Sequence, residues 1–151
     1  MYDDTSNATR AVNVISEFEA KQLSPLALAY IGDAVFETYV REIIVLTEPS
    51  GHTYEMHKRA ISVVKATSQA EILKKLNEML VEDEQYIVRR GKNAKPHSMP
   101  KNADILEYKL ATAFEALIGY LYITGKNDRL AAVLKKSCEV AGLLFTEEQG
   151  V

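Results

Sequence analysis

Two acidic residues stand inside otherwise apolar segments of this sequence, and they are the first candidates for chemistry. Asp33 lies within LALAYIGDAV, directly after Gly32, and Glu115 lies within LATAFEALIGYLY, four residues before Gly119. A carboxylate surrounded by apolar side chains carries a desolvation penalty. A glycine inside a helix costs about 1 kcal/mol relative to alanine. Each segment therefore combines an unfavourably placed acid with an unfavourable glycine.

The repetition of this pattern predicts that the two segments pack against each other with their acids close together. Gly32 would permit the close approach of another backbone, either a helix or RNA. Two neighbouring carboxylates repel each other unless they share a proton or a cation. A hard cation that takes oxygen ligands and keeps several waters removes this repulsion. We therefore predict that Asp33 and Glu115 are the catalytic residues and bind Mg²⁺.

A purely structural interpretation of Asp33 is also open. Glu37 and Arg41 follow at i+4 and i+8, so the three side chains are expected on one face of a helix. On that face they could form an ion ladder at the protein surface, with no role in catalysis.

Other chemistries find little support in the sequence. His52, His57 and His97 have no zinc-binding spacing with Cys138, and no phosphate-binding glycine loop or dinucleotide motif is present. Cys138 is the only cysteine, so it excludes an internal disulfide and is expected to be an inert core residue.

No apolar run approaches the roughly 18 residues of a membrane span, and the N-terminus does not resemble a secretory signal. We expect a cytoplasmic protein without a membrane partner.

A basic segment is a candidate phosphate-binding surface. The formal net charge is −3, but five basic residues occur between positions 89 and 101 without an acid, which leaves −8 for the rest of the chain. These five residues are Arg89, Arg90, Lys92, Lys95 and Lys101. Such a segment can bind phosphates even when the protein as a whole is acidic. Lys65 is a weaker candidate, and the alternative is that the segment is only a solvated surface loop.

The elements that must position these residues are predicted to be helices in a single domain. The 151 residues suit one domain, and the apolar spacing is helical nearly throughout. We expect a flexible N-terminus over 1–9 and one all-α domain over 10–147. The predicted helices run over about 10–21, 25–46, 53–80, 82–90, 102–123 and 128–145.

Several helix boundaries and one buried face follow from local signals. Ser24 followed by Pro25 is a typical helix start, Asn102 is a candidate N-cap, and Gly91 and Gly125 are candidate helix ends. The third helix is expected to break near 66–68. In the second helix, the residues expected to be buried are Leu26, Tyr30, Val35, Tyr39 and Ile43.

The two acidic segments resemble a known family. ALAYIGDAVFE is similar to the signature helix of ribonuclease III catalytic domains, and TAFEALIGYLY is similar to that family's second motif. The resemblance covers roughly residues 23–141. RRGKNAKPHSMPKN resembles the basic loop of the Mini-III ribonucleases, a compact branch in which no double-stranded-RNA-binding domain follows the catalytic domain. The sequence is therefore expected to belong to that branch.

The resemblance implies a fold, a reaction and partners. The fold would be the all-α ribonuclease III endonuclease domain, acting as a homodimer. The reaction would be Mg²⁺-assisted hydrolysis of double-stranded RNA that leaves a 5′-phosphate and a 3′-hydroxyl, with stems of precursor 23S ribosomal RNA as substrate. A ribosomal protein as helper is left open.

Only part of the family's set of metal ligands is present in this sequence. The family binds its metal with four carboxylates, and the resemblance assigns two of those positions to Asp33 and Glu115. Ala29 and Thr112 occupy the other two, a reduction that Mini-III ribonucleases share. The main rival is a non-catalytic module with the same fold that binds ribosomal RNA or helps assemble ribosomes. A third alternative is an all-α protein-interaction domain.

Overall fold

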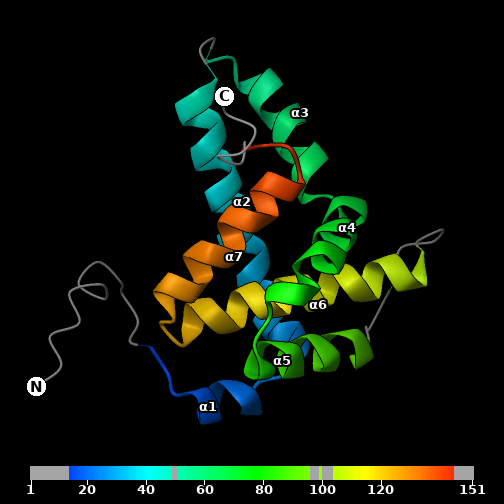
Figure 1. Ribbon diagram of the computed structural model, residues 1–151. Coiled ribbons are helices and arrows are strands. Elements are labelled where there is room, and N and C mark those ends of the chain that lie inside the picture. Colours follow the sequence, from blue (N-terminus) through cyan, green and yellow to red (C-terminus); the bar gives the residue numbers. More distant parts are fainter. Residues whose placement is uncertain (1–13, 49–50, 96–98, 100–103, 145–151) are drawn as a thin grey trace, which may run out of the picture.

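The computed structural model describes residues 14–48, 51–95, 99 and 104–144, and within these ranges the chain contains helices and no strands (Figure 1). The elements in chain order are α1 (Glu17–Gln22), α2 (Pro25–Thr47), α3 (Thr53–Val64), α4 (Ala66–Leu76), the 3-10 turn η2 (Asn77–Met79), α5 (Glu82–Asn93), α6 (Ile105–Ile123) and α7 (Asn127–Val140). The predicted all-α class is confirmed. No helix in the described part of the chain is long and apolar enough to cross a membrane.

Helix α6 forms the centre of the fold. From Leu110 to Leu121, every residue except Glu115 is buried. Helices α2, α4, α5 and α7 pack around it (Figure 1). A helix that is apolar on all sides must be covered on all sides, which explains this central position. The ring of Phe114 meets that of Phe36 on α2 edge to face, with centroids 4.9 Å apart.

Helix α2 begins where the sequence predicts, but it buries a different face from the one expected. The Ala27 amide donates to the Ser24 hydroxyl at 3.1 Å, and Pro25 occupies the first turn. The buried residues are Leu28, Ala29, Gly32, Phe36, Val40 and Ile44. Of the predicted set, Tyr30 was wrong, since it is 84% exposed. Val35, Tyr39 and Ile43 are partly buried and pack against the core, and Leu26 is partly buried. Because α2 is apolar on more than one side, the spacing of its apolar residues does not show which side packs against α6.

Two predicted caps around the basic segment were also wrong. Helix α5 does not end at Gly91 but continues to Asn93, because Gly91 is buried against the backbone of Ala113 on α6. Helix α6 begins after Asp104, whose carboxylate accepts from the Glu107 amide at 3.0 Å. The expected cap, Asn102, lies outside the described residues.

The remaining boundaries differ by smaller amounts. The predicted break in the third helix falls at Lys65, one residue earlier than expected, and separates α3 from α4. The first helix is shorter than predicted and starts after its cap, Ser16. The last helix ends at Val140 rather than near 145. Gly125, with φ of 70°, follows the end of α6 as predicted.

Candidate metal and RNA-binding site

The two acidic segments cross each other backbone to backbone. A Cβ atom on Gly32 of α2 would lie 1.7 Å from the carbonyl oxygen of Glu115 on α6. A Cβ atom on Gly119 would lie 1.9 Å from the carbonyl oxygen of Leu28. Both distances are far too short for any side chain, so each helix needs a glycine at the crossing. The close approach predicted for Gly32 is therefore made to a second helix and not to RNA.

This crossing brings Asp33 and Glu115 within electrostatic range of each other. Asp33 follows Gly32 and lies on the exposed side of α2, whereas Glu115 is half-buried on α6. The pKa of Glu115 is raised from 4.5 to about 8, chiefly because the carboxyl is buried and also because the negative charge of Asp33 is close. The pKa of Asp33 is raised too, first by burial and then by the charge of Glu37. The site holds excess negative charge that a proton or a cation can neutralise.

A third residue that the sequence analysis missed touches this pair. The amide of Gln69 on α4 lies close to the Glu115 carboxyl and acts against the rise in its pKa, as a hydrogen-bond donor does. The Gln69 side chain is almost fully buried, and its Oε1 atom has no hydrogen-bond partner. A signal for it existed in the sequence: Gln69 is the polar member of the inner face of α4, next to Ala70 and one turn before Leu73.

The alternative ion ladder on α2 is present only in part. Arg41 and Glu37 form an ion pair of 2.6 Å on the exposed surface. Among the residues that the structure describes, Asp33 joins no ion pair. The nearest acid on its own helix, Glu37, raises its pKa and does not stabilise its charge.

These residues fit a magnesium ion that keeps most of its waters. Ala29 and Thr112, one turn before the two acids, are buried and supply no carboxylate. Within the described ranges, no group of three or more His, Cys, Asp or Glu residues is placed to hold a metal. Mg²⁺ is commonly held in proteins by only one or two carboxylates, with water completing its shell. The unpartnered Oε1 of Gln69 is a further oxygen beside this site.

The basic segment divides into exposed residues and one residue with structural bonds. Arg89 and Lys92 are exposed near the end of α5, and Lys95 is exposed beyond it. Arg90 instead donates to the backbone carbonyls of Lys21 at 2.8 Å and Leu23 at 3.2 Å. It thereby ties α5 to the connection between α1 and α2.

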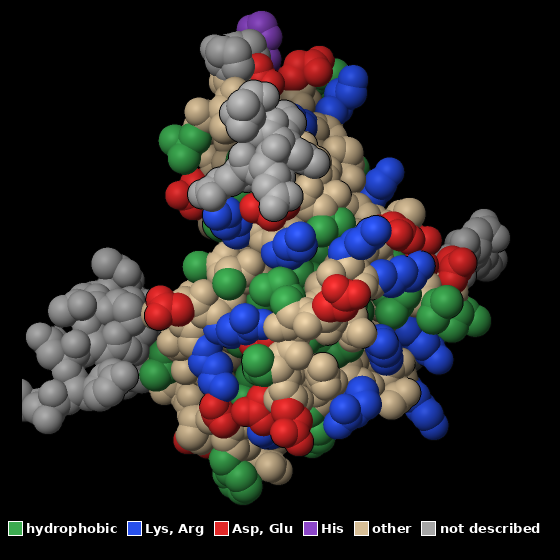
Figure 2. All heavy atoms as spheres, in the orientation of Figure 1, with side chains coloured by type: hydrophobic (Ala, Val, Ile, Leu, Met, Phe, Trp, Pro, Cys, Tyr) green, Lys and Arg blue, Asp and Glu red, His purple; other side chains and the backbone are tan. Residues whose placement is uncertain are grey.

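The exposed basic residues belong to one region of the surface. Figure 2 shows Lys and Arg side chains gathered over the C-terminal end of α5 and the start of α6. The contact of Gly91 with Ala113 holds this end of α5 against α6, two residues before Glu115. Lys65 is exposed between α3 and α4, and Lys101 lies outside the described residues.

Comparisons with known proteins agree with this architecture. The ribonuclease III domain family matches residues 26–126, about two thirds of the chain. A Mini-ribonuclease 3 from Symbiobacterium thermophilum is 48% identical over 117 residues, which are 78% of this chain and 89% of that protein. A Mini-ribonuclease 3 from Synechococcus is 38% identical over 136 residues, which are 90% of this chain and 96% of that protein. The chain belongs to the Mini-ribonuclease 3 family. The sequence resemblance is thus confirmed, and with it membership of the ribonuclease III endonucleases.

A solved structure extends the Mini-ribonuclease 3 assignment to the fold. The chain superimposes on a crystal structure of a protein from Fusobacterium nucleatum with a TM-score of 0.71 and 30% identity. The match covers 86% of this chain and all of the other. The predicted ribonuclease III fold is therefore confirmed over most of the molecule.

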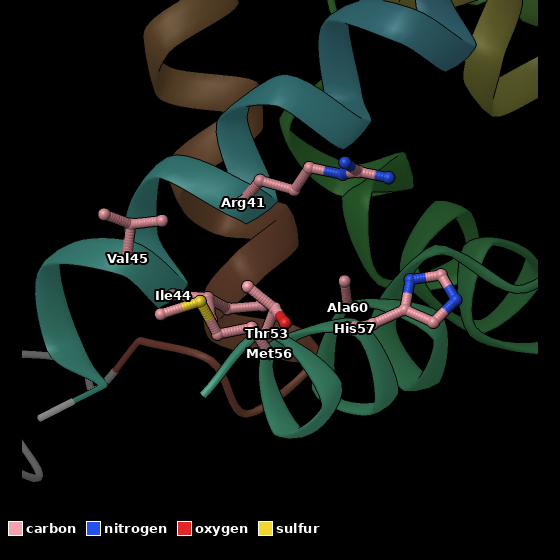
Figure 3. A pocket seen from close by; sticks show the side chains of 7 residues that line it. All are labelled: Arg41, Ile44, Val45, Thr53, Met56, His57 and Ala60. Atoms are coloured by element: carbon pink, nitrogen blue, oxygen red, sulfur yellow. The ribbon is translucent and has the colours of Figure 1, made fainter. Parts of the chain in front are cut away.

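Two of the hollows of this Mini-ribonuclease 3 that lie outside the acidic site flank α2. One, of about 180 Å³, lies between the C-terminal half of α2 and α3; Ile44 and Met56 lie between the two helices, with Arg41 and His57 to one side (Figure 3). Its lining contains no carboxylate. The other is a shallow groove of about 560 Å³ along α2, which we call the α2 groove. Its lining is Tyr30, Ile31, Ala34, Val35, Thr38, Tyr39, Glu42, Tyr122, Leu130 and Leu134.

Proposed function

We propose that this chain is an Mg²⁺-dependent endoribonuclease that hydrolyses double-stranded RNA and leaves a 5′-phosphate and a 3′-hydroxyl. The observation that carries the proposal is the pairing of Asp33 with Glu115 at the glycine crossing of α2 and α6. Membership of the Mini-ribonuclease 3 family supports the same activity. Stems of precursor 23S ribosomal RNA are the proposed substrate, to be tested with and without a ribosomal protein as helper.

Asp33 and Glu115 would hold the cation. Bound at this site, Mg²⁺ supplies a water of lowered pKa and neutralises charge on the reacting phosphate. The exposed position of Asp33 leaves the site open to a phosphate of the RNA backbone, while the half-buried Glu115 is held by the packing of α6. With water as the attacking group, neither Cys138 nor any other side chain is needed as a covalent nucleophile.

The exposed basic residues would bind the RNA duplex. A-form RNA is recognised mainly through its phosphates, 2′-hydroxyls and shape, which suits exposed Lys and Arg side chains. We assign this role to Arg89, Lys92, Lys95 and Lys101, with Lys65 as a further contact. Arg90 would act mainly through its bonds to the α1–α2 connection and only indirectly on RNA.

The active form would be a homodimer that uses the α2 groove. One metal site cuts one strand, so paired cuts in a duplex require two copies. The α2 groove is lined mostly by apolar side chains, and one of them, Tyr30, is 84% exposed. A second copy would remove this apolar surface from water.

The decisive experiment is incubation with long double-stranded RNA in Mg²⁺ or in EDTA. We expect cleavage in Mg²⁺ only, and loss of cleavage in Asp33→Asn, which removes a charge but almost no volume. Asp128→Asn, an exposed acid in the first turn of α7, is the matched control and should cut normally. A wild-type protein that binds the duplex but never cuts it would support the rival, a non-catalytic module that binds ribosomal RNA.

A further inference from the structure

Gln69 is a buried polar residue in an apolar setting. It lies on the inner face of α4, and its side chain is only 1% exposed. Ala70, Ile72 and Leu73, which are also buried, follow it in the sequence. A buried primary amide is destabilising unless its donors and its acceptor find hydrogen-bond partners. An apolar residue of similar size would fill the same space without that requirement.

The partners that Gln69 does find point to the metal site. Its amide lies close enough to the Glu115 carboxyl to lower the pKa of that group, and an interaction that favours the ionised carboxylate comes from the amide nitrogen, which is a donor. The other half of the amide, Oε1, is buried and has no partner in the described part of the chain. One end of this side chain therefore lies against a proposed metal ligand, and the other end is a buried acceptor without a partner in the described residues.

We propose that Gln69 is a positioning residue of the metal site. Its amide nitrogen holds the Glu115 carboxylate in the orientation in which it meets the cation together with Asp33. Its Oε1 atom accepts a hydrogen bond from a water retained at the site, which accounts for the missing partner. This inference rests on the proposed function, because it assigns Gln69 a role at the same site.

The reduced set of acids makes such a role more important here. Ala29 and Thr112 offer no carboxylate, so the cation depends on two ligands from the protein. With two ligands, the orientation of each one contributes more to affinity than it would in a set of four. Hydrogen bonds that orient metal ligands typically change metal affinity by about 10- to 100-fold when they are removed.

The test measures cation binding without RNA or turnover. Mn²⁺, a spectroscopic substitute for Mg²⁺, is titrated into the full chain and followed by electron paramagnetic resonance. In Gln69→Met, which keeps the length of the side chain but has no amide, we expect Mn²⁺ to bind about 10- to 100-fold more weakly than in the wild type. RNA affinity in EDTA should not change. The matched control is Ser137→Ala, which removes a buried hydroxyl that bonds to the Val133 carbonyl within α7.

The outcomes separate this inference from the proposed function. If the wild type binds Mn²⁺ and cuts RNA while Gln69→Met binds Mn²⁺ equally well, Gln69 only fills space and the inference is wrong. If the wild type neither binds Mn²⁺ nor cuts, the proposed function fails and the inference fails with it. Should Gln69→Met not fold, Gln69→Asn decides, because it keeps the amide but shortens the reach by one methylene. An Asn variant with wild-type Mn²⁺ affinity would overturn the positioning role.

Discussion

Replacing Glu115 by Gln should stabilise the metal-free protein while removing its activity. The buried carboxyl has its pKa raised from 4.5 to about 8 in the folded state. Between these two values, the unfolded chain loses the proton while the folded chain keeps it. The folded state of the wild type therefore loses stability as the pH rises from about 4.5 to about 8. Above about pH 8, its stability no longer changes with the titration of this group. Gln has the same shape and does not titrate.

The magnitude follows from the same pKa values. At about 1.4 kcal/mol per pH unit, the upper limit of the effect is about 5 kcal/mol. The linkage relation gives about 4 kcal/mol at pH 8 and about 1 kcal/mol at pH 5. Local rearrangement and entry of water relieve part of the penalty of a buried charge. We therefore expect Glu115→Gln to gain at least about 2 kcal/mol at pH 8, or roughly 4–8 °C in melting temperature for a chain of this size.

The assay is urea unfolding of both proteins at pH 5 and pH 8 in EDTA, followed by the same measurement in Mg²⁺. Saturating Mg²⁺ should stabilise the wild type by mass action and should do so much less in the variant. Glu71→Gln is the control, since Glu71 is an exposed acid paired with Lys74 at 3.1 Å. A stability difference between wild type and Glu115→Gln that is equal at pH 5 and pH 8 would refute the reasoning.

Four further predictions test the packing, the basic segment and the dimer. Gly32→Ala should lower the free energy of unfolding by about 3 kcal/mol or more, because its Cβ would overlap the Glu115 carbonyl; a melting temperature equal to the wild type would contradict the crossing. Arg90→Ala should lower stability by about 1–3 kcal/mol through its lost bonds to two carbonyls. Arg89→Ala should leave stability unchanged but reduce the slope of log RNA affinity against log salt by somewhat under one, and an unchanged slope would remove Arg89 from the interface. Tyr30→Asp should convert a dimer to a monomer in sedimentation equilibrium, and a variant that stays dimeric would place the interface elsewhere.

The features that could be predicted from the sequence are those with a local physical cause. Ser24 and Pro25 start α2 because capping involves only the first turn, and Gly125 follows α6 because its positive φ suits glycine. The meeting of Asp33 and Glu115 was predictable because each stands beside a glycine in an apolar helix, and such helices must pack closely.

Only the tertiary structure decided which partners distant residues find. The buried face of α2 could not be chosen, since Tyr30 and Leu28 lie on two apolar sides of one helix and α6 covers only one of them. Arg90 looked like a phosphate contact from its basic neighbours, yet its partners lie 67 and 69 residues away. Gln69 reaches Glu115 from a third helix. The periodicity of apolar residues and the distribution of charge indicate which side chains a segment can bury or expose. Hydrogen bonds between helices depend instead on the final orientation of those helices. The packing of all the helices around α6 determines that orientation.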